Sequence, residues 1–408
     1  MTSNPVNILV LNCGSSSLKY RLIQMPTGVD LISGEAQRVG VKSSEGGLII
    51  HFVAGKKTLY PRTLNTHLEA FLSVLEIIAM DAKENSLFQY HLFAHRYVHP
   101  GSHFSRTTEI KANNLGLLEE TLPLAPIHNP MSFELIKVCH EKYPQIPQFV
   151  VFDTSFHCQI PKSQKVYSLP QKISAKHQLY KVGFHGISHE YVLSSASQVL
   201  NTDLKQQKVI SCHLGSGGSS VCAILNGRSI NSSMGYTPLE GLIMNTRSGD
   251  IDPGLIFHYM FHEKISSQEM ENILNKKSGV LSLYKVSSDL RDAIKNYETD
   301  PNASLAVDLY IQRLHKYIGY YLLLLKKADV LIFTDTLGVE EPFVRQAVCE
   351  KLQFWGIEID PEMNQATQYQ SKLISTENSQ AKVVIIPTNE EFMIAQNAYK
   401  EYRHVYRS

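Results

Sequence analysis

Residues 7–24, NILVLNCGSSSLKYRLIQ, decide how this chain folds. The apolar run from Ile8 to Leu11 is followed by a turn of small polar residues, Asn12–Ser17, and then by apolar residues at every second position. This pattern predicts two strands joined by a short turn. Much later in the chain, residues 208–226, KVISCHLGSGGSSVCAILN, repeat the plan with a turn richer in glycine. The repeat indicates that the chain is internally duplicated.

The rest of the chain alternates short apolar strands, such as residues 148–152, with helical patterns, such as residues 132–142. That rhythm is typical of an α/β fold, and 408 residues exceed the size of most single cores. We therefore expect a duplicated, two-lobe α/β fold in which each lobe is a mixed sheet flanked by helices, with an inter-lobe cleft for a ligand. The expected N-terminal lobe is residues 1–150, joined by a C-terminal helix over 388–408, and the expected C-terminal lobe is residues 151–387.

The composition excludes several classes of function. Lys and Arg number 39 against 38 acidic residues, so no basic surface is available for nucleic acid or an anionic membrane. The six cysteines show no C-x-x-C pair and no disulfide-like spacing, which is typical of reduced thiols in the cytosol. No apolar stretch approaches the length of a membrane span, and the N-terminus lacks the pattern of a signal peptide. We expect a cytoplasmic protein with a small-molecule ligand and with neither nucleic acid nor membrane as a partner.

The two small-residue turns carry candidate phosphate ligands. Backbone N–H groups and hydroxyls of a Gly/Ser turn can hold phosphate oxygens, with a lysine as a point charge. A plain hairpin turn has the same composition, but two such turns facing one cleft favour phosphate. The candidates are Ser15, Ser17 and Lys19 in the first turn and His213, Gly215 and Gly217 in the second.

Several polar side chains stand where strands or turns end. Arg96 and Arg247 lie in Gly/Pro-rich loops, and a guanidinium suits a carboxylate or a phosphate, with an ordinary surface ion pair as the alternative. Asp153 ends an apolar strand, where carboxylates commonly reach the cleft of α/β proteins, unless it is a cap or turn residue. His128 and His185 lie in loops beside such residues, and the spacing of the histidines does not fit zinc.

Two acidic residues, Glu390 and Glu391, follow the strand expected over 383–386 and begin the final helix. We expect one of them to cap this helix and one to hold Mg²⁺, because carboxylate oxygens suit that ion. No P-loop, protein-kinase or G-x-S-x-G signature occurs in the sequence, which disfavours those classes of enzyme.

Taken together, the motifs resemble the acetate kinase family nearly from end to end. The resemblance implies the duplicated actin-like ATPase fold, also called ribonuclease H-like, which hexokinase and heat-shock chaperone ATPases share, and it implies a homodimer. The matching strings are Asn12–Lys19, His95–Arg96, Leu124–Pro130, Phe152–Thr154, Gly183–Gly186 with Ser188–His189, Ser233–Gly241, Thr246–Gly254, Lys276–Gly279 and Pro387–Glu391.

The family's reaction is reversible transfer of a phosphoryl group from ATP to acetate, directly in line, with Mg²⁺ or Mn²⁺ and without a phosphoenzyme. The resemblance implies that Arg96 and Arg247 flank acetate and the moving phosphoryl group. It implies that His185 binds the equatorial oxygens of that group and that Asp153 positions the attacking carboxylate. The other implied contacts are Asn12 at the transferred phosphate, Glu390 at magnesium, and Val98, Ile127, Pro238 and His128 around acetate.

The chain departs from the family after the strand expected over 330–333, where the family carries a Gly-Gly-Ile-Gly-Glu-Asn run against the adenosine. Residues 334–342 read TDTLGVEEP here, and we predict a turn before a helix over 342–354. Thr336 replaces a glycine and Glu340 replaces an amide, which weakens the case for an ordinary ATP site.

Other donor-side residues of the family are retained, and the donor therefore stays open between two kinds. ATP or ADP is favoured, while a pyrophosphate-linked branch of the family makes inorganic pyrophosphate the alternative. Two further alternatives are an enzyme that uses propionate or butyrate in place of acetate, and an inactive actin-like sensor. The change to Pro100 beside Val98 would affect the pocket for the acyl group. The donor-side candidates are Asp289 and Arg291 around ribose and adenine, with Thr336, Leu337 and Gly338 in the altered run.

Overall fold

The computed structural model divides into two compact units, each of which is described here by itself. The first unit is Met1–Ser155 with Asn389–Ser408, and the second is Phe156–Thr388. The described residues are 5–41, 46–365 and 369–406, so the expected lobes and the expected final helix include positions that lie outside them, namely 1–4, 42–45, 366–368 and 407–408. No helix in these described ranges is both long enough and apolar enough to cross a membrane.

The first unit is built on a sheet whose described strands follow the order β5-β4-β3-β2-β1-β6-β8-β7. Strands β1, β6 and β8 run parallel to one another, whereas β1, β2 and β3 form an antiparallel meander. The strands are β1 (Val6–Cys13), β2 (Ser17–Met25), β3 (Val29–Gln37), β4 (Gly47–Val53), β5 (Lys56–Arg62), β6 (Leu92–Tyr97), β7 (Thr108–Glu109) and β8 (Gln148–Phe152).

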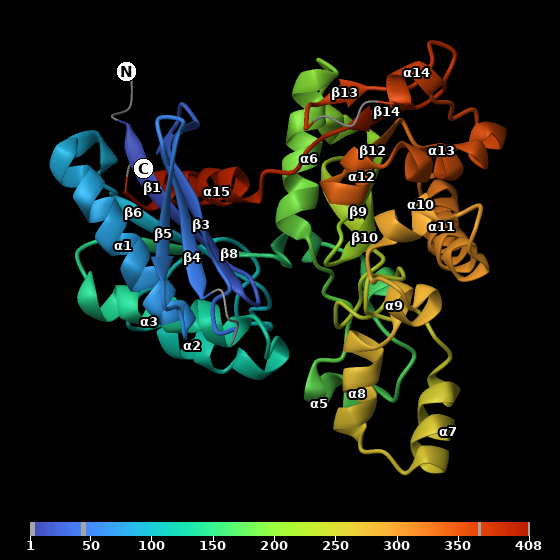
Figure 1. The fold of residues 1–408 in the computed structure, drawn as a ribbon, viewed down its shortest axis with the longest axis horizontal. Coiled ribbons are helices and arrows are strands. Elements are labelled where there is room, and N and C mark those ends of the chain that lie inside the picture. Colours follow the sequence, from blue (N-terminus) through green and yellow to red (C-terminus); the bar gives the residue numbers. More distant parts are fainter. Residues whose placement is uncertain (1–4, 42–45, 366–368, 407–408) are drawn as a thin grey trace. The chain divides into compact units, whose positions relative to one another are not determined.

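Helices cover both faces of this first sheet (Figure 1). Alternate residues of β1, such as Leu9 and Leu11, pack into a core with α1 and α3, because successive side chains of a strand point to opposite faces. Helix α15, which follows the second unit in the chain, returns to contact β1 and β2 of the first. The helices are α1 (His67–Glu84), α2 (Leu115–Glu119), α3 (Asn129–Lys142) and α15 (Glu390–Tyr406), with short 3-10 turns over Ser86–Phe88 and Leu122–Leu124.

The second unit repeats the plan of the first. Its described strands follow the order β11-β10-β9-β12-β14-β13, with β9, β12 and β14 parallel and β9 to β11 an antiparallel meander. The order β11-β10-β9-β12-β14 matches β3-β2-β1-β6-β8 strand for strand, which confirms the predicted duplication. The strands are β9 (Lys208–Leu214), β10 (Ser219–Leu225), β11 (Arg228–Ser232), β12 (Val330–Thr334), β13 (Lys372–Leu373) and β14 (Lys382–Ile385).

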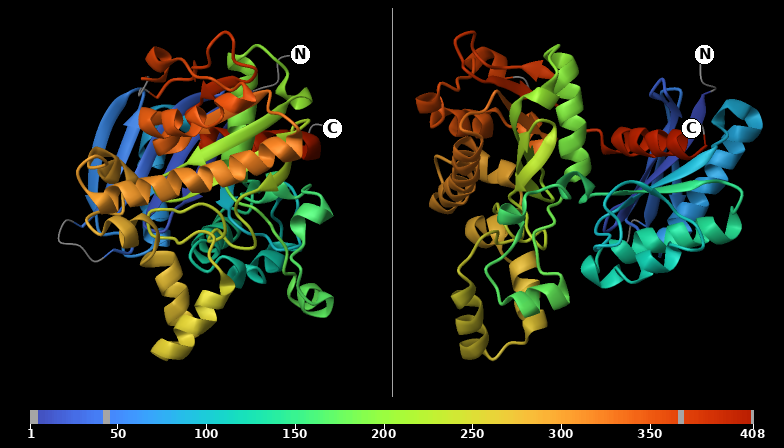
Figure 2. Two further views of the ribbon diagram at one scale, coloured as in Figure 1. Left: turned by 90° about the vertical axis from the view of Figure 1, so that its right-hand side faces the viewer. Right: turned by 180° about the vertical axis from the view of Figure 1, so that it is seen from behind.

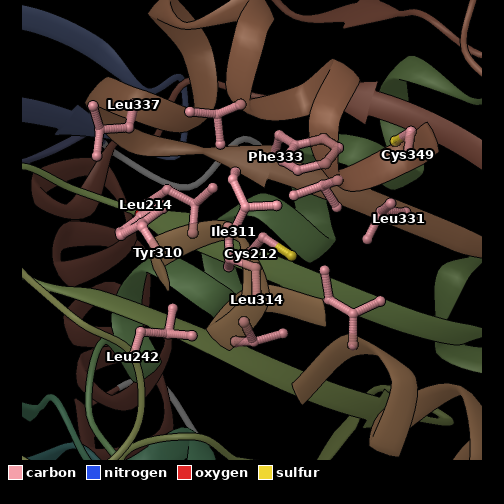
Figure 3. Packing of buried hydrophobic residues seen from close by; sticks show 14 of the residues in the cluster. Cys212, Leu214, Leu242, Tyr310, Ile311, Leu314, Leu331, Phe333, Leu337 and Cys349 are labelled. Carbon is pink, nitrogen blue, oxygen red and sulfur yellow. The ribbon is translucent and has the colours of Figure 1, made fainter. Parts of the chain in front are cut away.

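The long helix α11 crosses one face of the second sheet, as the left panel of Figure 2 shows. Alternate residues of β9 and β12, such as Cys212 and Phe333, pack against it in the core of Figure 3, and α6 covers the other face. The helices are α4 (Lys162–Lys165), α5 (Gln171–His177), α6 (Gly186–Val199), α7 (Pro253–Glu263), α8 (Ser267–Lys276), α9 (Gly279–Tyr284), α10 (Leu290–Lys295), α11 (Pro301–Leu325), α12 (Asp335–Glu340), α13 (Pro342–Glu350) and α14 (Pro361–Asn364), with 3-10 turns over Ser155–His157, Leu204–Gln206 and Gln353–Trp355.

The turn predicted around Gly338 is wrong, because α12 occupies this position. Asp335 takes a left-handed φ of 62° immediately after β12 and so turns the chain straight into a helix. The helix buries Leu337, and the buried Arg345 of α13 donates Nη1 to the carbonyl oxygens of Gly338 and Val339 at 3.0 and 2.8 Å. A side chain from the next helix thus supplies the hydrogen bonds that the end of α12 needs.

Candidate active site

Three predicted site residues of the first unit lie together at one edge of its sheet. Arg96 of β6 donates Nη1 to Asn12 Oδ1 at 3.2 Å and Nη2 to Asp153 Oδ2 at 3.2 Å. Asn12 lies near the end of β1 and Asp153 directly follows β8. Because β1, β6 and β8 are parallel neighbours, their carboxyl ends meet at this edge. The structure therefore brings together the asparagine, arginine and aspartate that the sequence singled out.

The guanidinium of Arg96 is held as a cation by carboxylates around it. Burial lowers the pKa of Arg96, but the charges of Asp153, Glu390 and Glu391 outweigh burial and leave this pKa above its usual value. Asn12 Nδ2 donates to Glu391 Oε1 at 2.9 Å, and Glu391 is buried at the start of α15. The sequence predicted that one of these two glutamates caps α15, but the cap that the structure shows is Asn389, whose Oδ1 accepts from Phe392 N at 3.2 Å. Glu391 binds Asn12 instead.

The first small-residue turn is closed by a backbone hydrogen bond from Gly14 N to Ser17 O at 2.8 Å. His67 Nε2 lies 2.9 Å from the Gly14 carbonyl oxygen and fixes the turn to α1. Ser15 and Lys19 are exposed, and Lys19 pairs with Asn12 across β1 and β2. Directly paired residues lie on the same face of a sheet, so Lys19 stands on the face that carries Asn12.

The residues expected around acetate belong to both units. In the first unit Val98 is buried, Ile127 is half exposed and His128 precedes α3. Asn129 ties these segments together, because its side chain donates to the carbonyl oxygen of His99 at 2.9 Å and accepts from His99 N at 3.2 Å. Pro238 belongs to the second unit.

In the second unit, His185 and Arg247 converge on the second turn. A Cβ placed on Gly218 would lie 3.3 Å from His185 Nε2 and 3.5 Å from Arg247 Nη1. Arg247 Nη1 also donates to the Pro238 carbonyl oxygen at 3.3 Å. Burial lowers the pKa of Arg247, yet a guanidinium stays charged in proteins. The turn thus presents a histidine and a cation side by side.

Buried serines and a second histidine position His185. Ser220 Oγ lies 2.9 Å from His185 Nδ1 and 3.0 Å from His189 Nε2, and His189 Nδ1 lies 2.9 Å from Ser211 Oγ. Burial, together with the charges of neighbouring histidines, keeps the pKa of His189 well below its usual value, so His189 is neutral. The single hydroxyl proton of Ser220 therefore couples the tautomers of the two histidines. Sequence reasoning missed Ser220, and its only signal was a place after the glycine-rich turn.

Several residues predicted to bind the phosphate donor form hydrogen bonds or ion pairs with other side chains of the second unit. His213 Nε2 lies 3.0 Å from Asp335 Oδ2, Gly215 approaches the same carboxylate, and a side chain at Gly217 would meet open space. The other contacts are Thr336 Oγ1 with Ser216 N at 3.0 Å, and Arg291 with Asp289 at 2.7 Å and with Glu340 at 2.8 Å, while Leu337 and Gly338 are buried in α12.

The described residues contain no group of three or more histidine, cysteine, aspartate or glutamate side chains placed to hold a metal ion. Magnesium commonly uses only one or two carboxylates and takes its other ligands from water and substrate phosphates. A single carboxylate at the start of α15, that of Glu390, fits that mode of binding.

The chain is similar to known proteins over nearly its whole length. The sequence profile of the Acetokinase family matches residues 7–396. An acetate kinase of Thermoanaerobacterium thermosaccharolyticum is 40% identical over 401 residues, covering 97% of this chain and 98% of that protein. The crystal structure of Porphyromonas gingivalis acetate kinase superposes with a TM-score of 0.88 at 35% identity, covering 97% and 99% of the two chains. The crystal structure of a propionate kinase from Francisella tularensis superposes with a TM-score of 0.86 at 34% identity, covering 97% of this chain and 99% of that chain.

The fold is the duplicated actin-like α/β fold, and it belongs here to an enzyme, a phosphotransferase with a carboxyl group as acceptor. Within that class, the chain is a member of the acetokinase family.

Proposed function

We propose that the protein catalyses reversible phosphoryl transfer between ATP and acetate, giving ADP and acetyl phosphate. The observation that carries the proposal is Arg96, a cation fixed at the end of β6 by Asn12 and Asp153. Relatives that match nearly the full chain and bear the name acetate kinase support acetate as the acceptor.

The reaction requires oriented substrates and positive charge near the transferred phosphoryl group, and it requires no general base. A carboxylate oxygen of acetate attacks the γ-phosphorus of ATP, an O–P bond forms, and the bond from that phosphorus to the β,γ-bridging oxygen breaks. ADP leaves with the electron pair. Because acetate is already ionised at neutral pH, no proton has to be removed, and catalysis depends on orientation and on stabilising the charge of the transferred group.

Each proposed residue has a role that its contacts support. Arg96 and Arg247 bring positive charge to the transferred phosphoryl group. Asp153 forms an ion pair with Arg96 and through it positions the attacking carboxylate. His185 donates a hydrogen bond from Nε2 to a phosphoryl oxygen, and Ser220 on Nδ1 keeps the ring in that orientation. The acetate methyl would meet Val98, Ile127 and Pro238, and His128 would contact the acetate.

Magnesium would be held by Glu390 together with phosphate oxygens of the donor, and manganese would serve in its place. When bound, the ion neutralises phosphate charge. Glu391 has a different task in this proposal, because it is buried and accepts from Asn12.

The proposal also places the protein in the cytoplasm. All six cysteines are free thiols, and five of them are buried. Free thiols are typical of proteins kept in a reducing compartment.

The test of the proposed reaction is acetyl phosphate formation, trapped as the hydroxamate, with acetate and one donor at a time. We expect product with ATP and Mg²⁺, and loss of product when a chelator removes the metal. Parallel reactions with GTP and pyrophosphate, and with propionate and butyrate, identify the preferred partners. Product with pyrophosphate and none with ATP would overturn the assignment of the donor.

Helix α7 supports the proposal of a homodimer. This helix has no buried residue, and its side chains of Phe257 and Phe261 are 72% and 79% exposed. Exposed apolar patches of this kind mark interaction surfaces, and we propose that a second copy of the chain covers α7.

We expect Phe257→Asp combined with Phe261→Asp to yield a monomer in light scattering after size-exclusion chromatography, while the unchanged protein has the mass of two chains. Phe354→Asp is the matched control, because Phe354 is 91% exposed outside α7, and this variant should stay dimeric. A double variant that remains a dimer would rule out α7 as the interface.

A further inference from the structure

An acidic side chain of the chain itself occupies the turn after β9. Asp335 Oδ2 lies 3.0 Å from His213 Nε2, and a Cβ placed on Gly215 would come within 2.3 Å of the same oxygen. Asp335 holds a left-handed φ of 62°, which glycine adopts freely and aspartate tolerates better than most residues. The glycine-rich run of the family begins at this position, so the carboxylate over the turn is a departure of this chain.

A backbone donor of the same turn is engaged as well. Ser216 N donates to Thr336 Oγ1 at 3.0 Å, and Thr336 N donates to Asp335 Oδ1 at 2.7 Å. Backbone N–H groups of such a turn are the groups that bind phosphate oxygens. An incoming phosphate therefore has to displace Asp335 from His213 and Thr336 from Ser216.

Arg291, which the resemblance assigns to ribose and adenine, is paired with two carboxylates of its own chain. Arg291 Nη2 donates to Asp289 Oδ2 at 2.7 Å, and Arg291 Nη1 donates to Glu340 Oε2 at 2.8 Å. Both acidic side chains are about three-quarters buried, with exposed fractions of 27%. Glu340 stands where the family carries a neutral amide, which can form no ion pair. A nucleoside that needs Arg291 has to compete with this contact.

We propose that Asp335 and Glu340 are the donor-selecting residues of this enzyme and that each competes with one part of the donor. Asp335 competes with the phosphates, and Glu340 competes with the nucleoside. The inference rests on the proposed function for its meaning, since it concerns the donor of that reaction. Because pyrophosphate has no nucleoside, Glu340 should weaken the binding of a nucleotide and leave the binding of pyrophosphate unchanged.

The test measures binding rather than turnover. Isothermal titration of the magnesium complexes of ADP and of pyrophosphate is carried out on the full chain and on Asp335→Gly, Asp335→Asn and Glu340→Asn. We expect Asp335→Gly to tighten both ligands about tenfold, which is the scale of one charge-assisted contact. Asp335→Asn should tighten them less, because a neutral amide still accepts from His213. Glu340→Asn should tighten ADP about tenfold and leave pyrophosphate unchanged.

Glu350→Gln removes a carboxylate from an exposed position of α13 and should change neither affinity, and thermal melting verifies that each variant is folded. Unchanged or weaker binding of both ligands by Asp335→Gly would overturn the proposal for Asp335. Equal tightening of ADP and pyrophosphate by Glu340→Asn would overturn it for Glu340. A separate hydroxamate assay that gives no product with any donor would refute the proposed function and leave the binding result to decide this inference.

Discussion

Replacing Arg96 by alanine is expected to lower kcat at least roughly a thousandfold, the scale at which arginines act in phosphoryl transfer. Arg96 contacts both Asn12 and Asp153, so its removal takes away the cation and also leaves the Asp153 carboxylate without the guanidinium that fixes it. Arg247→Ala is expected to have an effect of the same order, for the loss of the cation beside His185. Steady-state rates with saturating ATP and acetate measure both.

Two comparisons separate charge from fold. Arg96→Lys keeps a positive charge but not the fork that binds two acceptors at once, and we expect it to recover only part of the lost rate. The melting temperature of Arg96→Ala should fall, because the buried carboxylate of Asp153 loses its cation, so circular dichroism at the assay temperature verifies that the variant is folded. Rates near those of the parent in either alanine variant would remove that arginine from the mechanism.

Replacing Arg345 by methionine is expected to reduce the free energy of unfolding of the second unit by about 3–5 kcal/mol, the cost of breaking a buried polar network at one partner. Arg345 is fully buried. It donates Nε to Asn364 Oδ1 at 2.8 Å and Nη2 to the Asn364 carbonyl oxygen at 2.6 Å, besides its bonds to the end of α12. Burial lowers the pKa of Arg345 to about 10, so the side chain is still charged at neutral pH. Methionine fills much of the space and leaves these acceptors unsatisfied.

Urea denaturation followed by tryptophan fluorescence measures this loss, because the single tryptophan of the chain, Trp355, lies in the second unit. Gln346→Met is the control on the same helix, since Gln346 is exposed, and it should change stability by less than about 0.5 kcal/mol. If Arg345→Met and Gln346→Met unfold at the same urea concentration, Arg345 does not hold α12 and α13 together.

The features that could be predicted from the sequence depend on residues that are close together along the chain. Alternating apolar residues around two small-residue turns predicted the paired hairpins, and the matching strand orders confirm the duplication. The meeting of Arg96 with Asp153 was predictable in outline, because both stand at the carboxyl ends of strands that an α/β sheet makes parallel.

Other features depend on contacts between distant residues. The helix α12 begins because Asp335 takes a left-handed conformation, which a propensity for turns around Gly338 does not reveal. Ser220 joins His185 to His189 only after β10 and α6 are packed together. Glu391 binds Asn12 across the packing of α15 on β1, and two adjacent glutamates look alike in sequence.

In the proposed reaction an acetate oxygen attacks the phosphorus of the donor, and isotope-resolved phosphorus NMR with ¹⁸O-labelled acetate, ATP and Mg²⁺ tests this step directly. We expect acetyl phosphate whose phosphorus signal carries the upfield isotope shift of one bridging ¹⁸O. The absence of acetyl phosphate, or acetyl phosphate without ¹⁸O bonded to phosphorus, would rule out attack by an acetate oxygen on ATP.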